Sequence, residues 1–232
     1  MLGPIPTPVN GTGQMNGSGR LNCIAFHPTL ANVIYAGAPA GGFWTSTDNG
    51  NSWTQSIAGM IRLGVSSIVV HPTNPNIIYI GTGDRDGGDV PGYGVWRSTD
   101  GGTTWSAYNS GMGNRTVNEI IMHPSNSNII YAATNGFVFK TIDGGANWTA
   151  SNNLGVNCYD IALHPTDPNI VYAGCGSGEF HRSTNGAVSF SQVTSGLSSG
   201  SRMAIAVSPN QPDWVYGLIG DGSGLVLSLI HI

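Results

Sequence analysis

The octet that decides the fold is Ser98-Thr99-Asp100-Gly101-Gly102-Thr103-Thr104-Trp105. It has the composition of a tight turn between two strands. Asp100 can accept hydrogen bonds from backbone N–H groups a few residues downstream, and the two glycines tolerate the positive φ that such a turn needs. Trp105 then begins the next strand, where its ring can fold back over the turn and bury a large apolar face. The octet therefore predicts a strand, a turn and a second strand.

The octet occurs four times in the chain. The other copies are Ser46-Thr47-Asp48-Asn49-Gly50-Asn51-Ser52-Trp53, Thr141-Ile142-Asp143-Gly144-Gly145-Ala146-Asn147-Trp148 and Ser183-Thr184-Asn185-Gly186-Ala187-Val188-Ser189-Phe190. The last copy is degenerate, because Asn185 replaces the acid and Phe190 replaces the tryptophan. Positions one, three, five and eight of the octets, where they fit the pattern, are filled by Ser46, Asp48, Gly50, Trp53, Ser98, Asp100, Gly102, Trp105, Thr141, Asp143, Gly145, Trp148, Ser183, Asn185 and Phe190. Because the acids recur at one position, and an amide can replace them, we assign them to turn formation rather than catalysis.

Two further marks repeat in register with the octets. An apolar triplet precedes His-Pro or Ser-Pro at Ile24-Ala25-Phe26-His27-Pro28, Ile68-Val69-Val70-His71-Pro72, Ile120-Ile121-Met122-His123-Pro124, Ile161-Ala162-Leu163-His164-Pro165 and Ile205-Ala206-Val207-Ser208-Pro209. A tyrosine stands eight residues after each His or Ser, at Tyr35, Tyr79, Tyr131, Tyr172 and Tyr216. The steps between units are 44, 52, 41 and 44 residues, and four-stranded propeller blades take about 40–45 residues. We expect the histidines to form strand-end hydrogen bonds, since one per blade is too sparse for a metal site.

The octet resembles the Asp-box, Ser-x-Asp-x-Gly-x-x-Trp, which is also called the BNR repeat. Asp-boxes occur in β-propellers of sialidases, xyloglucan-degrading endoglucanases, sortilin-type receptors and a photosystem assembly factor. The resemblance implies an all-β chain with four complete four-stranded blades and a partial fifth, which is an incomplete propeller. Bacterial secreted Asp-box proteins are the most similar, through the opening at residues 19–28 and the Gly-rich stretch at 36–42. These families share the turn and not the chemistry, so activity stays open.

The repeats divide the chain into three parts. Residues 1–19 are rich in Gly, Pro and Asn and form an extended lead-in. Residues 20–226 form the partial propeller, whose fifth unit lacks an octet and would leave an exposed sheet edge. Residues 227–232 resemble the translation of a sequencing adapter and are expected to be a non-native tail. We therefore expect a fragment whose partners include the remaining blades of a longer chain.

Composition excludes several classes of protein. Only 9% of the residues are charged, against about 25% in typical domains. The net charge is −4 without a basic cluster, which argues against nucleic-acid binding, and no apolar run is long enough to span a membrane. The three cysteines, Cys23, Cys158 and Cys175, lack zinc-type spacing and have apolar neighbours, so buried thiols are expected. The sequence predicts no cofactor.

The unit of 52 residues carries its excess in a loop at residues 82–93. This loop holds Asp84, Arg85, Asp86 and Asp89, the best ligand-binding candidates, because function in repeat proteins gathers in such insertions. The spacing of Asp84, Asp86 and Asp89 resembles a calcium loop, although the downstream Glu of an EF-hand is absent. Calcium binding, substrate contact and an ordinary solvated loop are all open.

Two more acids occupy one repeat position. Four residues before the His of their units stand Glu119 and Asp160, where the inner strand of a blade faces the central channel. Paired carboxylates suit glycoside hydrolysis, as acid with base or nucleophile. Solvated charges at the channel mouth are the interpretation that we favour. The cations Arg97, Lys140 and Arg182 also recur, three residues before the third octet position, and we expect them on a solvated blade face.

Two classes of function follow from the resemblance. Sialidase is disfavoured, because its arginine set, tyrosine nucleophile and N-terminal motif do not assemble here. The favoured class is a secreted or cell-surface propeller that binds a glycan, peptide or protein without catalysis. The alternative is a fragment of a xyloglucanase-like glycoside hydrolase, a family that places catalytic aspartates on two separate propellers. Extracellular or cell-surface location is implied by the resemblance alone.

Overall fold

The computed structural model describes residues 20–56, 63–86, 88, 90–194, 197, 199–221 and 224–231, so the predicted lead-in at 1–19 lies outside the described residues. Within this part of the chain, nineteen strands form five antiparallel sheets. The described residues contain no helix that is long and apolar enough to cross a membrane.

Each sheet is one blade, built from strands in chain order. Blade 1 contains β1 (Cys23–Phe26), β2 (Ile34–Ala38), β3 (Gly42–Ser46) and β4 (Thr54–Ser56). Blade 2 contains β5 (Val65–Val70), β6 (Ile78–Thr82), β7 (Val95–Ser98) and β8 (Ser106–Ala107). Blade 3 contains β9 (Val117–Met122), β10 (Ile130–Thr134), β11 (Val138–Thr141) and β12 (Thr149–Ala150). Blade 4 contains β13 (Cys158–Leu163), β14 (Val171–Cys175), β15 (Phe180–Ser183) and β16 (Ser191–Val193). Blade 5 contains β17 (Arg202–Val207), β18 (Trp214–Asp221) and β19 (Gly224–His231).

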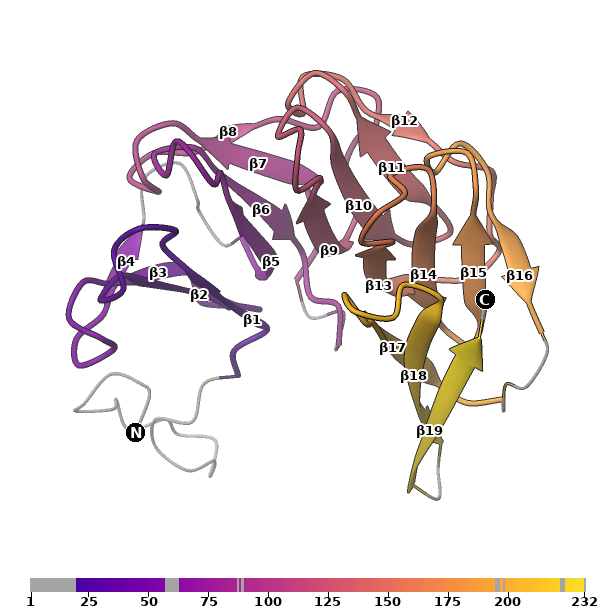
Figure 1. Cartoon of the computed structure of the whole chain (residues 1–232). Coiled ribbons are helices and arrows are strands. Elements are labelled where there is room, and N and C mark those ends of the chain that lie inside the picture. The colour runs from indigo at the N-terminus through magenta and orange to yellow at the C-terminus, as the bar shows by residue number, and fades with distance from the viewer. Residues whose placement is uncertain are drawn as a thin grey trace.

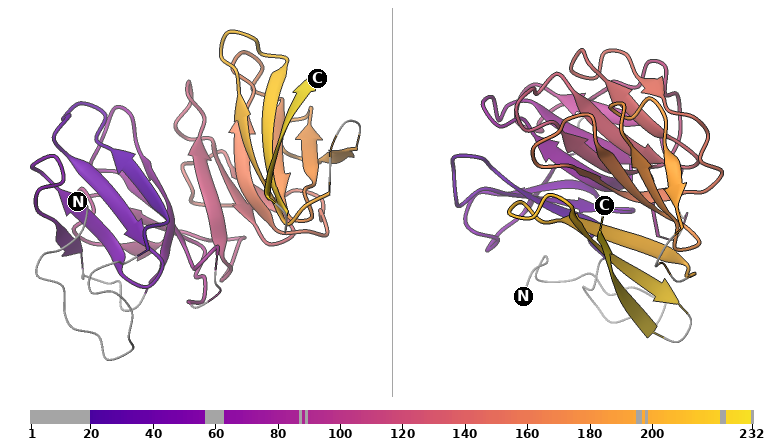
Figure 2. Two further views of the ribbon diagram at one scale, coloured as in Figure 1. Left: turned by 90° about the horizontal axis from the view of Figure 1, so that it is seen from below. Right: turned by 45° about the vertical axis from the view of Figure 1, so that its right-hand side comes forward.

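The five blades follow one another around an open arc. Figure 1 shows β1, β5, β9, β13 and β17 on the inner side of the arc and the last strands of the blades on the outer side. The views in Figure 2 show the same order, with the first and last blades at the two ends of the arc. Neighbouring inner strands contact each other from β1 to β17. This arrangement confirms the predicted partial β-propeller.

The apolar core lies between the blades. Each of the four buried clusters joins side chains of two consecutive blades. Between blades 1 and 2, for example, Phe43 of β3 packs edge-on against Trp105, with ring centroids 4.9 Å apart. The repeated tyrosine is buried in blades 1 to 4, whereas Tyr216 of blade 5 is 37% exposed. Stacking of neighbouring blades therefore buries apolar side chains that a single blade would leave exposed.

The octets turn the chain from the third strand of a blade to the fourth. The Ser98 hydroxyl donates to Oδ1 of Asp100 at 2.8 Å and accepts the Gly102 N–H at 2.8 Å. Asp100 also accepts the backbone N–H and the hydroxyl of Thr104, at 2.8 and 2.6 Å. The Trp105 indole N–H donates back to the Gly102 carbonyl at 3.1 Å. The Ser98 hydroxyl, the Asp100 carboxylate and the Trp105 indole thus all bond within the octet.

The other octets repeat these bonds. The first hydroxyl donates to the third residue at 2.8, 2.7 and 2.9 Å in the octets that begin with Ser46, Thr141 and Ser183. Hydrogen bonds from the residue four positions after each aspartate lower the pKa to about 2 at Asp48, Asp100 and Asp143. Asn185 accepts the same two bonds through its amide oxygen. The geometry therefore needs the acceptor oxygen and tolerates loss of the charge.

The His-Pro marks end the inner strands. Nδ1 of His71 accepts the backbone N–H groups of Thr73 and Asn74 at 3.3 and 3.1 Å. His27 and His164 make the same pair of bonds. One ring nitrogen thus accepts two backbone N–H groups and stabilises the turn that Pro72 and its equivalents begin. Proline cannot contribute to this turn as a donor, because it has no N–H group. These histidines are turn residues.

Side chains near the start of each inner strand bond to the backbone of the next blade. Asn22, Ser66 and Asn118 donate to carbonyls of the following inner strand, namely those of Val65, Val117 and Cys158. One position later, Ser67 accepts the N–H of Ile120 at 2.9 Å and Asp160 accepts the N–H of Ile205 at 2.7 Å. We call these bonds the inner-strand stitches. In all five, the side chain belongs to the earlier blade and the backbone group to the later one.

Two expectations about side chains need correction. Cys158 and Cys175 were expected as buried thiols, but they face each other on β13 and β14 and form a disulfide. The repeated cations were expected on a solvated face, but they lie half-buried at the blade interfaces. Lys140 Nζ, for example, donates to the Gly186 carbonyl of the next blade at 2.8 Å. The reason is that both faces of an inner blade are covered by neighbours, so a strand residue that points away from its own sheet still meets another blade.

Strand β19 pairs with β18 along its whole length, with Leu227 opposite Leu218. The predicted non-native tail at 227–232 falls within this strand up to residue 231, and Ile232 lies outside the described residues. The assignment of this tail stays a prediction.

Candidate functional site

Charged side chains from three blades and from the segment before β1 gather on the inner side of the arc. We call this set the axial charge cluster, and its members are Arg20, Asp84, Arg85, Asp86, Glu119 and Arg202. Asp84, Arg85 and Asp86 lie in the enlarged loop after β6. Glu119 lies in β9, and Arg202 is the first residue of β17. Candidates that the sequence treated separately, the loop and the channel carboxylate, therefore form one site.

The loop is anchored through Asp84. Its side chain is fully buried, and Oδ2 lies 2.5 Å from the guanidinium of Arg20, which precedes β1. Oδ1 of Asp84 accepts the backbone N–H of Asp86 at 3.0 Å, which bends the chain locally. At the start of the loop, Gly83 has a φ of 110°, a conformation that side chains rarely adopt. These contacts fix the direction in which Arg85 leaves the loop.

Arg85 connects three blades. Its guanidinium lies 3.7 Å from Oε2 of Glu119 on blade 3 and donates to the Asn22 carbonyl near blade 1 at 3.2 Å. Its own neighbour Asp86 lies 3.8 Å away. The guanidinium thus sits where the inner strands converge, and its five donors suit several acceptors at once.

Arg202 brings blade 5 into the cluster. It forms an ion pair with Asp86 and donates to the Arg85 carbonyl at 3.2 Å. Its guanidinium also lies 4.0 Å from the ring centre of Tyr159 on blade 4, a cation–π contact. The loop of blade 2 therefore contacts the far end of the arc.

Glu119 differs from the residues that occupy its position in neighbouring blades. At that position, Ser67 and Asp160 each accept a backbone N–H of the next inner strand. In the blade after Glu119, the equivalent N–H is that of Ile161, and Asp160 itself already accepts it at 2.8 Å. Glu119 therefore does not accept the N–H group of Ile161, and its longer side chain reaches Arg85 instead.

The environment of Glu119 favours its protonated form. Burial, then the nearby charge of Asp160, raises the pKa of Glu119 to about 7, against the opposing effect of Arg85. Burial also raises the pKa of Asp160, although two backbone N–H groups work in the other direction. Because both oxygens of Asp160 accept backbone N–H groups, Asp160 is committed to holding blades 4 and 5 together. Glu119 pairs instead with the Arg85 side chain.

The loop carboxylates are matched by arginines rather than by one another. Asp84 pairs with Arg20 and Asp86 pairs with Arg202, while Asp89 lies outside the described residues. In the part of the chain that the structure describes, no three His, Cys, Asp or Glu side chains group as a metal site requires. A calcium ion would have to displace two guanidinium groups to use these oxygens.

Sequence reasoning found the acids of this cluster and Arg85, and it missed Arg20 and Arg202. Arg20 and Arg202 do not occupy a position that recurs in the repeats. The one sequence signal for them is that cations are rare, since the chain has eight Lys and Arg residues together. Cys23 occupies the position of Glu119 in blade 1, and burial raises the pKa of its thiol to about 12. A thiol held in the protonated form is a poor nucleophile.

Comparisons with known proteins point to carbohydrate-active enzymes. No protein-family model matches the chain. A xyloglucanase of Hypocrea jecorina (strain QM6a) is 30% identical over 148 residues, which are 57% of this chain and 18% of that protein. The xyloglucanase Xgh74A of Acetivibrio thermocellus is 29% identical over 163 residues, 62% of this chain and 19% of that protein. The structure resembles that of an ancestral GH74 enzyme with a TM-score of 0.73 and 25% identity, over 92% of this chain and 28% of that one.

The chain spans about a fifth of the length of the curated relatives that it matches. These relatives do not support the non-catalytic scaffold that the sequence favoured, and they fit the hydrolase-like alternative better. The sequence pointed the other way because its most distinctive residues, the octets, form turns and carry no information about chemistry.

Proposed function

We propose that the chain is part of a secreted glycoside hydrolase that cleaves a β-glucan of the xyloglucan class, with Glu119 as proton donor. The octets would then be Asp-boxes that hold a propeller scaffold, and the axial charge cluster would face the substrate. The observation that carries the proposal is the position of Glu119. This carboxyl group has a pKa of about 7 and does not accept the backbone N–H group of the next blade that its equivalents accept.

The chemistry follows from that carboxyl group. Glycoside hydrolysis needs an acid that gives a proton to the oxygen of the glycosidic bond as the bond to the anomeric carbon breaks. An acid with a raised pKa keeps that proton near neutral pH and still loses it readily, which is the usual condition for general acid catalysis. The charge left on Glu119 would be stabilised by Arg85, 3.7 Å away.

A second carboxylate must activate the attacking water or form a glycosyl intermediate. Asp160 does not suit this role, since both its oxygens accept backbone N–H groups. The second carboxylate is proposed to come from another part of a longer hydrolase. The chain covers about a fifth of each xyloglucanase that it matches, so a protein of that length can supply the second carboxylate outside the matched part. Extracellular location belongs to the same proposal, because a polysaccharide is cleaved outside the cell.

The test is hydrolysis of xyloglucan by the longer hydrolase that the proposal implies, followed through new reducing ends, in the parent and in Glu119→Gln. Loss of a general acid typically lowers kcat by about 10²–10⁴-fold. The amide keeps the shape of the side chain, so binding of xyloglucan should survive. Asp100→Asn is the matched control, because it removes one carboxylate from an octet far from the cluster and should leave kcat unchanged.

Two results would contradict the proposal. The first is a longer hydrolase, with the second carboxylate present, that binds xyloglucan and releases no reducing ends. The second is a Glu119→Gln variant whose kcat and pH profile match those of the parent, which would place the catalytic acid elsewhere.

A further inference from the structure

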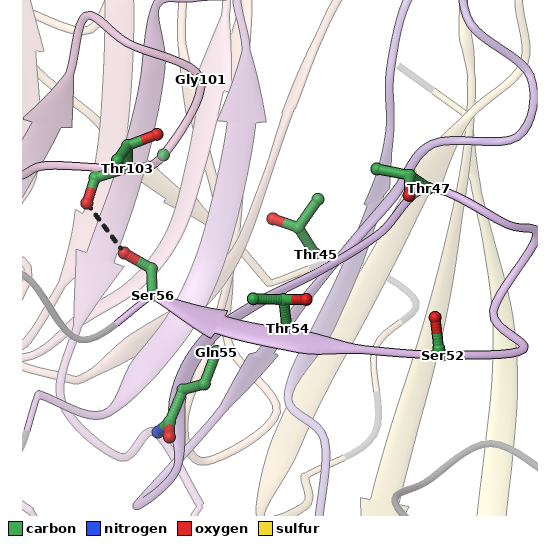
Figure 3. A pocket seen from close by; sticks show the side chains of 9 residues that line it. Thr45, Thr47, Ser52, Thr54, Gln55, Ser56, Gly101 and Thr103 are labelled. Carbon is green, nitrogen blue, oxygen red and sulfur yellow. Dashed lines mark hydrogen bonds between the residues drawn. The ribbon is translucent and has the colours of Figure 1, made fainter.

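A polar hollow of about 430 Å³ lies between blades 1 and 2, away from the axial charge cluster. Figure 3 shows Thr45, Thr54 and Ser56 of blade 1 on one side and Gly101 and Thr103 of blade 2 on the other. Ser56 bridges the two blades through a hydrogen bond to the Thr103 carbonyl at 3.3 Å. The described lining consists of hydroxyl, amide and backbone groups and carries no charged side chain.

The hollow arises because a small residue replaces a repeated cation. In blades 2, 3 and 4, the repeated tyrosine lies directly across the strands from a cation, in the pairs Tyr79–Arg97, Tyr131–Lys140 and Tyr172–Arg182. In blade 1, the residue across from Tyr35 is Thr45. The threonine side chain lacks the length and the charge of its equivalents.

A second replacement enlarges the space. Three residues after the octet tryptophan, blade 2 has Tyr108 and blade 1 has Ser56. At the interface of blades 2 and 3, the Arg97 guanidinium lies 4.9 Å from the ring centre of Tyr108 and 5.7 Å from that of Tyr79. Among the described residues, the interface of blades 1 and 2 thus lacks both the guanidinium and the outer ring that covers it.

The acceptor that faces this space is retained. At the fourth octet position, the carbonyl of Gly144 accepts the Tyr79 hydroxyl at 2.7 Å, and that of Gly186 accepts Lys140 Nζ at 2.8 Å. The equivalent carbonyl belongs to Gly101, which lines the hollow. Among the described residues, the structure gives this carbonyl no hydrogen-bond donor.

The charges around the hollow are negative. Asp100 precedes Gly101 in the octet of blade 2, and Asp48 binds Ser52, which also lines the hollow. Neither carboxylate forms an ion pair within the described residues. The next two interfaces place Arg97 or Lys140 beside their octets, whereas the described lining of this interface offers hydroxyl, amide and backbone groups.

We propose that the hollow between blades 1 and 2 is a binding site for a guanidinium group, carried by a small molecule or by an arginine side chain of a partner. The group would occupy the place that Arg97 has one interface further on and donate to the Gly101 carbonyl and to the threonine hydroxyls, next to the two octets that carry Asp48 and Asp100. This inference is independent of the hydrolase proposal, because it uses none of the axial residues.

The test is a titration of the ¹⁵N-labelled protein with n-propylguanidinium, followed by ¹H–¹⁵N NMR. The indole N–H of Trp105 is a built-in reporter, since it lies 3.2 Å from the Ser56 hydroxyl. We expect saturable shifts of this indole and of the Gly101, Gly102 and Thr103 amides. n-Propylurea, a neutral molecule of the same shape, should bind at least tenfold more weakly. A capped Ala-Arg-Ala peptide separates the sources: tighter binding than that of propylguanidinium indicates a protein partner, and equal binding indicates a small molecule.

The matched variant fills the hollow from within. Thr45→Arg with Ser56→Tyr restores the residue pair of blade 2 and should weaken propylguanidinium binding at least tenfold. Thr45→Lys, which changes one residue, should do the same if the double variant does not fold. The proposal is overturned if propylurea binds as tightly as propylguanidinium. It is also overturned if a folded filled variant keeps the parent affinity, or if cellobiose shifts these signals and propylguanidinium does not.

Discussion

The outer and inner parts of this propeller use carboxylates in opposite ways. In the octets on the outer part, Asp48, Asp100 and Asp143 have pKa values lowered to about 2, because each accepts hydrogen bonds from hydroxyl or amide groups within its own turn. On the inner strands, burial raises the pKa of Glu119 to about 7 and also raises that of Asp160. Hydrogen-bond donors stabilise the charged form in one region, and loss of water destabilises it in the other.

The difference shows how repeated and unrepeated acids divide their roles. An acid that recurs once per blade accepts hydrogen bonds from residues of its own repeat. Contacts within that repeat therefore stabilise its charged form. Glu119 occupies a repeat position but is released from the repeat bond, and its partner Arg85 comes from a loop of irregular length. Protonation of the inner carboxylate therefore depends on contacts between distant segments.

The largest effect is expected from Arg85→Met, which removes the centre of the axial charge cluster. Glu119 would lose its counter-charge and Asn22 would lose a donor. We expect the free energy of unfolding to fall by about 2–3 kcal/mol at pH 8, less than for a fully buried pair. At pH 5 the loss should be smaller, because Glu119 is then protonated. Urea unfolding monitored by tryptophan fluorescence measures both values.

Arg97→Met is the control for that variant, since it removes a half-buried guanidinium that stacks on two tyrosines without a carboxylate partner. Its effect should be about 1 kcal/mol or less and the same at both pH values. Equal losses at pH 5 and pH 8 for Arg85→Met would show that the inner carboxylate does not sense Arg85.

A smaller effect with a defined pH dependence is expected from Glu119→Gln. The folded pKa of about 7 lies above the ordinary value of 4.5. Between these pH values the folded protein retains a proton that the unfolded chain releases, so the stability of the parent falls as pH rises from 4.5 to 7. The Gln variant lacks this loss and should gain about 1–2 kcal/mol over the parent across that range, allowing for partial exposure of the side chain. Parallel stability–pH curves from pH 4 to 8 would contradict this.

The smallest effect is expected from Asp100→Asn, because Asn185 holds the same position in another octet with equivalent bonds. The Tm at pH 7 should change by no more than about 2 °C. The lowered pKa of Asp100 implies stability that the parent loses as pH falls from 3.8 towards 2, and the variant should be insensitive there.

Ser98→Ala is the contrasting variant in the same octet, and differential scanning calorimetry compares the two. It removes a buried hydroxyl that bonds both Asp100 and Gly102. A loss of about 1–3 kcal/mol corresponds to a Tm lower by several degrees. If Asp100→Asn lowered the Tm as much as Ser98→Ala, the octet would depend on charge after all.

The parts of the structure that follow the repeat could be predicted from the sequence. Octets, His-Pro pairs and tyrosines each bond within their own blade or to the next one, so their spacing is sufficient to place them. Contacts of the enlarged loop could not be predicted, because the path of an insertion depends on what it meets. The Arg85–Glu119 and Arg202–Asp86 pairs join residues far apart in the chain, and no local pattern encodes them.

The cysteines and the repeated cations illustrate two other limits. Cys158 and Cys175 face each other across two strands, but their pairing requires the register, which shifts between Cys158 and Asp160. The cations were placed on a solvated face because strand alternation tells which side a residue is on and not what covers that side. Thr45 occupies the cation position in blade 1, and only the packing of the neighbouring blade shows the space that its short side chain leaves.

The inner-strand stitches bear on how such an array grows. In each stitch a side chain of one blade binds a peptide group of its successor, as Asn118 binds the Cys158 carbonyl and Ser67 the Ile120 N–H. Peptide groups are the same in every blade, whatever the side chains. A duplicated or transplanted unit would therefore be accepted by any predecessor that has a stitching residue, so the number of units can change during evolution without a matching change in the newcomer.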